Sequence, residues 1–114
     1  MVTDSIRAKG LADGISELGG QQVFVKDGKA TLKDGTLAGS TLTMNKAIEN
    51  LVTKCGVSFT DAIDMATINP AKNLGIDTQM GSISVGKNAD FTVLDSRFNV
   101  VMTIRNGKNI HKIS

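Results

Sequence analysis

Two pairs of turn-forming residues, Asp27-Gly28 and Asn106-Gly107, constrain the fold of this chain more than any other feature of its sequence. Two-residue β-hairpin turns prefer such pairs, because both central positions of the turn require a positive φ. Each pair lies between runs of β-forming residues, so the sequence predicts one antiparallel hairpin near each end of the chain. The first pairs residues 23–25 with 29–32, and the second pairs 100–104 with 110–113.

Between the hairpins, the apolar residues follow the period of an α-helix. From residue 44 to 55 they recur at three- and four-residue steps and give one apolar face. Ser58 and Asp61 predict a capping box at the start of a second helix, and Asn69-Pro70 predicts the start of a third. Further strands are expected at residues 82–85 and 91–94. This order of elements indicates an α+β fold for the isolated chain, with few strands and an incomplete core.

The same patterns predict the surroundings of single residues. Phe59 and Leu74 are expected to pack on the buried side of their helices, with Gly75 ending the third helix. Cys55 lies on the apolar face of the first helix and is expected to be a buried structural thiol. His111 is expected at the surface or at a sheet edge.

The first forty residues are expected to contain little structure besides the hairpin. Residues 1–20 are poor in apolar side chains, and only Val2 is expected to belong to a strand, as its end. Residues 35–40 are rich in small side chains and are expected to form a loop. Ser40 or Thr41 is then expected to cap the following helix.

Composition excludes several classes of protein. The 114 residues include 13 Lys and Arg against 11 Asp and Glu, so the net charge of +2 is too small to indicate a nucleic-acid partner. No apolar run approaches the length of a membrane-spanning helix. The single Cys excludes an internal disulfide and favours a reducing compartment, the cytoplasm. The single His leaves the chain short of ligands for a self-contained hydrolytic metal site.

Three segments carry residue types that suit chemistry. Asp4 follows Val2-Thr3, where a carboxylate at a strand end either caps a turn or serves an active site. The Gly-containing segment 35–40 either makes a tight connection or lets a ligand approach its backbone. The third segment, residues 69–95, contains Asn-Pro-Ala, Leu-Gly, Gly-x-Ile-x-x-Gly-Lys-x-Ala-Asp and Val-Leu-Asp.

The third segment resembles the closing part of the amidohydrolase superfamily. In that superfamily it covers the last helices of a (β/α)8 barrel and the return into a small β-sandwich domain. Gly-Thr-Leu-Ala-Gly-Ser at residues 35–40, followed by Leu-Thr-Met, narrows the resemblance to the family of deacetylases that act on N-acetylglucosamine 6-phosphate. The resemblance begins at residue 1 and covers almost the whole chain.

The resemblance implies a role for each matching position. Asp4 matches the family's Asp at the end of the eighth barrel strand, the general base toward a metal-bound water and then the acid toward the leaving amine. Leu37, Ala38 and Gly39 match the segment whose backbone contacts the amino-sugar phosphate. The family's metal ligands, a Glu and two His that bind zinc or iron, come from earlier strands and have no counterpart here. The chain alone is therefore expected to be inactive.

The resemblance also implies a division of the chain and a setting for it. Residues 1–75 would be the end of the barrel domain, and residues 76–114 would be C-terminal strands of the β-sandwich domain. The intact enzyme would be a cytoplasmic homo-oligomer that hydrolyses its substrate to glucosamine 6-phosphate and acetate, with no nucleic-acid or membrane partner. Two alternatives stay open: a non-catalytic β-rich module that self-associates, or part of a dihydroorotase-like or adenine-deaminase-like enzyme.

Overall fold

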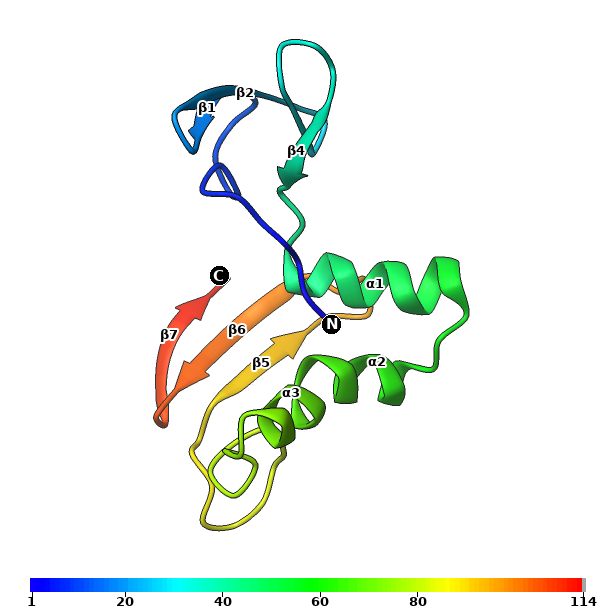
Figure 1. Ribbon diagram of the computed structural model, residues 1–114. Coiled ribbons are helices and arrows are strands. Elements are labelled where there is room, and N and C mark those ends of the chain that lie inside the picture. Colours follow the sequence, from blue (N-terminus) through cyan, green and yellow to red (C-terminus); the bar gives the residue numbers. More distant parts are fainter. Residues whose placement is uncertain (114) are drawn as a thin grey trace. The chain divides into compact units, whose positions relative to one another are not determined.

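The structure, a computed structural model, describes residues 1–113 as two compact units. The N-terminal unit comprises Val2–Met44, and the C-terminal unit comprises Met1 and the chain from Asn45 onward. Each unit contains one antiparallel sheet, and the C-terminal unit also contains the helices (Figure 1). The expected mixture of helix and antiparallel sheet is confirmed. Within residues 1–113, no helix has the length and apolar character needed to cross a bilayer.

The N-terminal unit is a four-stranded antiparallel sheet in sequential order. Its strands follow one another across the sheet because tight turns connect them. The predicted hairpin at Asp27-Gly28 is confirmed, and Val25 pairs with Ala30 across it. The strands are β1 (Gly14–Leu18), β2 (Gln21–Lys26), β3 (Lys29–Thr31) and β4 (Leu37–Ser40).

Strand β1 corrects the expectation that only Val2 in the first twenty residues belongs to a strand. Residues 1–4 form no strand, and Val2 is largely exposed. Strand β1 has no apolar alternation to reveal it, because it is an edge strand with exposed side chains on both faces except Ser16. Its signal is the turn that follows, since Gly19-Gly20 adopts the positive φ angles of a hairpin turn.

Strand β4 corrects the expectation of a loop over residues 35–40. Leu37–Ser40 pairs with β3, and only Gly35 and Thr36 of the expected loop lie in the connection before it. Neither expected cap is formed, because α1 begins only at Met44. The Ser40 hydroxyl instead accepts the Leu42 N–H at 2.8 Å, and the Thr41 hydroxyl donates to the Gly28 carbonyl at 2.9 Å.

The core of the N-terminal unit is small. Four residues form its buried centre, and three partly buried ones pack against it. Val23 is its largest fully buried side chain. The buried residues are Ala8, Val23, Val25 and Ala30, and those around them are Ile6, Leu32 and Ala38.

In the C-terminal unit, three helices precede the sheet: α1 (Met44–Cys55), α2 (Phe59–Ala66) and α3 (Ile68–Asn73). The predicted cap of α2 is confirmed, because the Ser58 hydroxyl accepts the Asp61 N–H at 3.1 Å. It also donates to the Asp61 carboxylate at 2.7 Å. Gly75, at a φ of +68°, stops helix α3 as expected. The stop is a Schellman motif, in which the Gly75 N–H donates to the Lys72 carbonyl and the Ile76 N–H donates to the Ala71 carbonyl.

Four expectations about these helices are wrong. Helix α3 begins at Ile68, so Pro70 lies within its first turn, where the helix still requires no N–H donor. Leu74 is 72% exposed and Cys55 is exposed. Cys55 is the last residue of α1 and Leu74 is the C-cap residue just after α3, so both lie at helix ends. Phe59 is 53% exposed, although its ring contacts Phe98 with the centroids 6.2 Å apart.

The second sheet has the order β5 (Phe91–Leu94), β6 (Val100–Arg105), β7 (Lys108–Lys112). The predicted turn at Asn106-Gly107 is confirmed, with Arg105 paired to Lys108. His111 lies exposed on the edge strand β7, as expected.

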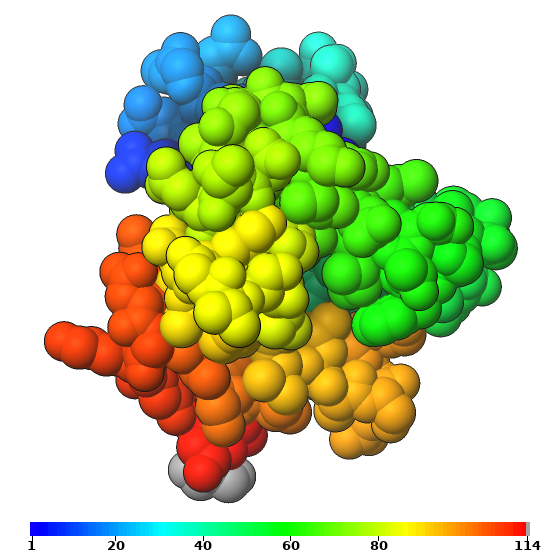
Figure 2. Space-filling view, turned by 90° about the horizontal axis from the view of Figure 1, so that it is seen from below, coloured from blue at the N-terminus to red at the C-terminus, as the bar shows by residue number. Residues whose placement is uncertain are grey.

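The strand expected at residues 82–85 is not formed. Ile83 and Val85 are 84% and 107% exposed, on a surface segment drawn in yellow in Figure 2. Hydrogen bonds rather than strand pairing hold this segment. The Lys87 ammonium donates to the Asp77 carbonyl and to the Ser82 hydroxyl, and the Asn88 N–H donates to the Gln79 carbonyl at 2.8 Å.

The β5–β6 connection is organised by one carboxylate, that of Asp95. It accepts the side-chain N–H of Asn99 at 3.0 Å and the backbone N–H groups of Asn99 and Arg97, each at 2.8 Å. The bonds from Asn99, supported by Arg97, hold the pKa of the Asp95 carboxyl below its usual value of 3.8. The same connection reaches the helices, because the Phe98 carbonyl accepts from the Asn45 amide at 2.9 Å.

Replacement of Val23 by Ala is expected to lower the free energy of unfolding by about 2 kcal/mol, because it leaves a cavity in a core with few other members. Urea unfolding followed by far-ultraviolet circular dichroism measures this, since the chain has no Trp or Tyr for fluorescence. Ile15→Ala is the matched control. Ile15 is 67% exposed on β1, so its replacement is expected to have little effect. Equal losses in the two variants would contradict this view of the core.

Acid is expected to weaken the β5–β6 connection through Asp95. Its pKa in the folded chain is lower than in the unfolded chain, so its contribution to stability is present above pH 3.8 and is lost as the pH falls through the folded pKa. Amide hydrogen exchange at Arg97 and Asn99, measured against pH, reports this loss. In Asp95→Asn, which keeps an oxygen acceptor but does not titrate, this additional acid sensitivity is expected to disappear. An unchanged pH profile in that variant would assign the effect to another group.

Candidate functional site

The structure brings Asp4 next to the strand that contains Leu37, Ala38 and Gly39. The Asp4 carbonyl accepts the Ser40 N–H at 3.3 Å, and the Ile6 N–H donates to the Ser40 carbonyl at 2.8 Å. Ser5, between them, forms a parallel bridge with Ser40. Two segments that lie more than thirty residues apart in the sequence therefore meet through main-chain hydrogen bonds.

The backbone of Asp4 adopts an unusual conformation. Its φ is +50°, in the left-handed region that few residues other than Gly and Asn or Asp occupy. The two hydrogen bonds on either side of Ser5 hold the chain in this conformation. The Asp4 side chain is exposed. The carboxylate is thus free to meet a solute while its main chain is anchored.

Gly39 makes this close approach possible. A Cβ atom at position 39 would lie 2.5 Å from Cγ2 of Ile6 and 3.9 Å from the Asp4 carbonyl oxygen. The φ of Gly39, +146°, also disfavours a side chain. The Ile6 methyl therefore occupies the space that any other residue at position 39 would need. Ile6 itself carries no sequence signal that marks it as part of this arrangement.

The remaining members of the predicted segment have different surroundings. Leu37 is 71% exposed, whereas Ala38 is partly buried and packs on the core of the N-terminal unit. The Ser5 hydroxyl donates to the Leu42 carbonyl at 2.5 Å, which adds a further link between the two segments. Leu37 and Asp4 thus present exposed groups, while Ala38 and Gly39 provide the packed backbone beneath them.

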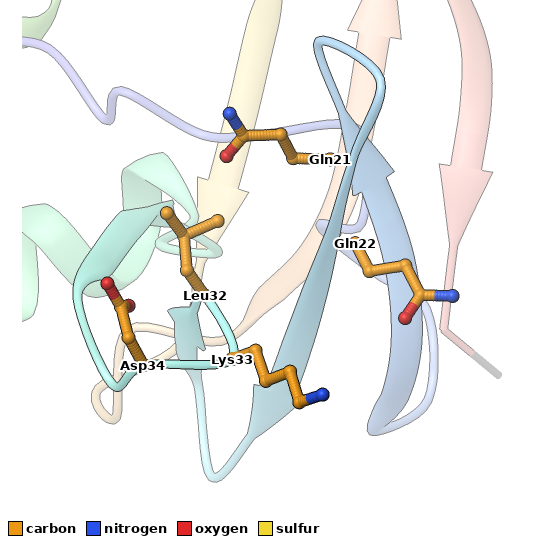
Figure 3. A pocket seen from close by; sticks show the side chains of 5 residues that line it. All are labelled: Gln21, Gln22, Leu32, Lys33 and Asp34. Atoms are coloured by element: carbon orange, nitrogen blue, oxygen red, sulfur yellow. The ribbon is translucent and has the colours of Figure 1, made fainter.

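A shallow depression elsewhere on the N-terminal unit does not include these residues. It lies between the start of β2 and the turn after β3, and the polar ends of its side chains point in different directions (Figure 3). The Thr36 N–H, which donates to Asp34 at 2.9 Å, lowers the pKa of the Asp34 carboxyl and keeps it charged. The lining residues are Gln21, Gln22, Leu32, Lys33 and Asp34. This depression lacks the converging groups of an active site.

The described residues do not form a metal site. Across residues 1–113, no three His, Cys, Asp or Glu side chains come together in a way that could hold a metal ion. A hydrolytic metal centre normally requires three protein ligands and an open position. The donors in this chain therefore do not fit a catalytic metal by themselves.

Comparison with known proteins identifies the family. The model of the amidohydrolase family matches residues 4–110. The chain belongs to the amidohydrolase family. This family is generally metal-dependent.

Individual relatives agree with this assignment. The chain is 46% identical over 114 residues to the N-acetylglucosamine-6-phosphate deacetylase of Bacillus subtilis (strain 168), covering 100% of this chain and 28% of the relative. It is 40% identical over 100 residues to a putative N-acetylgalactosamine-6-phosphate deacetylase of Escherichia coli (strain K12), covering 88% and 60%. The crystal structure of N-acetylglucosamine-6-phosphate deacetylase from Pasteurella multocida matches with a TM-score of 0.90 and 37% identity, covering 95% and 28%. The chain thus spans under a third of the length of the first and third of these relatives.

Replacement of Gly39 by Ala is expected to separate Asp4 from β4, because the new methyl group would overlap the Ile6 side chain. We expect a loss of about 1–3 kcal/mol in the free energy of unfolding, together with faster hydrogen exchange at the Ile6 and Ser40 amides. Gly14→Ala is the matched control, since Gly14 has a similar φ of +154° but open space where the Cβ would lie. If both variants lost the same stability, the backbone conformation rather than the Ile6 contact would explain the need for glycine.

Proposed function

We propose that this chain is the C-terminal part of a metal-dependent deacetylase that hydrolyses N-acetylglucosamine 6-phosphate to glucosamine 6-phosphate and acetate. The observation that carries the proposal is the match of the whole chain to a relative of that name at 46% identity. The adjacency of Asp4 and β4 supports it, because the two segments that the sequence singles out lie side by side.

The fold assignment that accompanies this proposal is specific. Residues 1–75 would supply the last strand, the substrate segment and the closing helices of a (β/α)8 barrel, and residues 76–114 would supply strands of a small β-sandwich domain. The TM-score of 0.90 to the Pasteurella multocida enzyme supports a shared arrangement. In such barrels, carboxylates at the C-terminal ends of strands face the active site. Residues 1–4 are not paired in a strand in this structure, so the strand that Asp4 would follow is part of the proposal.

In this proposal Asp4 moves protons. Its exposed carboxylate would accept a proton as water attacks the N-acetyl carbonyl, and it would then donate that proton to the nitrogen that leaves as an amine. Leu37, Ala38 and Gly39 would contact the amino sugar, with Gly39 letting the substrate approach the backbone closely. The divalent metal, zinc or iron, would be held by ligands outside this chain, so that the isolated chain has no turnover.

Two further properties belong to the same proposal. A single Cys that cannot form an internal disulfide supports a cytoplasmic location. The exposed edge strand β7 supports self-association, either in a homo-oligomeric enzyme or in the alternative, a non-catalytic β-rich module.

A chimera tests the proposed activity. The segment of the Bacillus subtilis deacetylase that matches this chain is replaced by the chain, and release of acetate from N-acetylglucosamine 6-phosphate is measured with added zinc or iron. We expect the chimera to be active, and Asp4→Asn within it to lower kcat by about 10²–10⁴-fold because the proton acceptor is lost. The same assay is expected to show no turnover by the isolated chain.

Asp64→Asn in the same chimera is the matched control, because Asp64 is an exposed carboxylate on α2, away from Asp4 in the sequence. It is expected to retain full activity. Equal activity of the Asp4→Asn chimera and the unsubstituted one would remove Asp4 from the mechanism. Assay with N-acetylgalactosamine 6-phosphate as well tests the second candidate substrate, which the Escherichia coli relative suggests.

A further inference from the structure

The Asn106-Gly107 turn combines two groups that can react with each other. Asn106 is the only Asn in the sequence that is followed by Gly, and both residues are exposed. In such a pair the backbone nitrogen of the Gly can attack the side-chain carbonyl carbon of the Asn, because the Gly has no side chain to hinder the approach. The reactivity of this pair therefore depends on how freely the Gly107 nitrogen can move.

In the folded chain that nitrogen is held. The Gly107 N–H donates to the Ala89 carbonyl at 2.9 Å, and the Asn106 N–H donates to the Asp90 carboxylate at 2.6 Å. The two acceptors are consecutive residues that immediately precede β5, so the segment before that strand holds both amides of the turn by hydrogen bonds. A bonded N–H is less available for deprotonation and attack than a free one.

We propose that Asn106 is a deamidation site whose rate of reaction is controlled by the hydrogen bonds from the turn to Ala89 and Asp90. When these two hydrogen bonds break, the deprotonated Gly107 nitrogen forms a bond to Cγ of Asn106, and the bond from Cγ to the side-chain nitrogen breaks with release of ammonia. Water then opens the resulting cyclic imide at either carbonyl. The products are aspartate and isoaspartate.

Both products would loosen the hairpin that contains them. Isoaspartate adds a methylene group to the backbone of a two-residue turn, whose geometry closes the pairing of Arg105 with Lys108. Aspartate instead places a second carboxylate beside Asp90. Reaction at Asn106 would therefore irreversibly weaken the hydrogen bonds between the turn that leads into β7 and the segment before β5.

The test incubates the 114-residue chain at neutral pH and follows the mass gain that accompanies replacement of an amide by a carboxyl, with peptide mapping to locate it. We expect the gain at Asn106 alone, slowly in the unsubstituted chain and roughly five- to tenfold faster in Asp90→Ala, which loses the bond to the Asn106 N–H. Asn99 and Asn109 are internal controls, because Val and Ile follow them and hinder attack.

Asp90→Asn distinguishes loss of the hydrogen bond to the Asn106 N–H from general unfolding. It keeps an oxygen that can accept the Asn106 N–H, so its rate is expected to match that of the unsubstituted chain. A synthetic peptide of residues 103–110 lacks Ala89 and Asp90, so it gives the deamidation rate without these hydrogen bonds and is expected to react fastest. Equal rates in the intact chain and the peptide would overturn the proposal, as would a rate in Asp90→Ala no higher than that in Asp90→Asn.

Discussion

Every strand pairing in this structure is closed by a short connection, and three of these connections are two-residue turns at positive φ. Gly19-Gly20, Asp27-Gly28 and Asn106-Gly107 adopt φ pairs of 59° and 82°, 50° and 75°, and 48° and 73°. Such turns match the twist of the strands that they join, so they determine which residues face each other. The connections between β3 and β4 and between β5 and β6 are five residues long, and these short connections together give both sheets their sequential order.

The second constraint is the small size of the apolar core. The buried residues are mostly Ala and Val, and several large apolar side chains, including Ile83 and Val85, lie at the surface. Hydrogen bonds consequently organise segments that packing would otherwise hold. The Asp95 carboxylate accepts hydrogen bonds from Arg97 and Asn99 in the β5–β6 connection. The Lys87 ammonium donates to the Ser82 hydroxyl in the segment after α3.

The candidate site shows how sequence and tertiary structure share the information. Asp4 and the Leu37–Gly39 segment are recognisable from residue types and from the family resemblance. Their adjacency cannot be recognised from the sequence, because it depends on main-chain hydrogen bonds of Asp4 and Ile6 with Ser40, and almost every residue offers the same main-chain groups. Ile6 could not be found from the sequence either, because its role is to occupy the space above Gly39, and only the tertiary structure brings the two residues together.

The sequence by itself determined the local elements whose cause is local. These are the two predicted hairpin turns, the helix Met44–Cys55, the Ser58 cap and the Gly75 stop, each set by residues within one or two turns of the chain. Only the tertiary structure decided β1 and β4, because each is an edge strand that forms through its neighbour's hydrogen bonds, and no alternation of buried apolar side chains marks it in the sequence. It likewise decided that Cys55 and Leu74 are exposed, since helical periodicity identifies an apolar face but not how far along the helix a partner covers it.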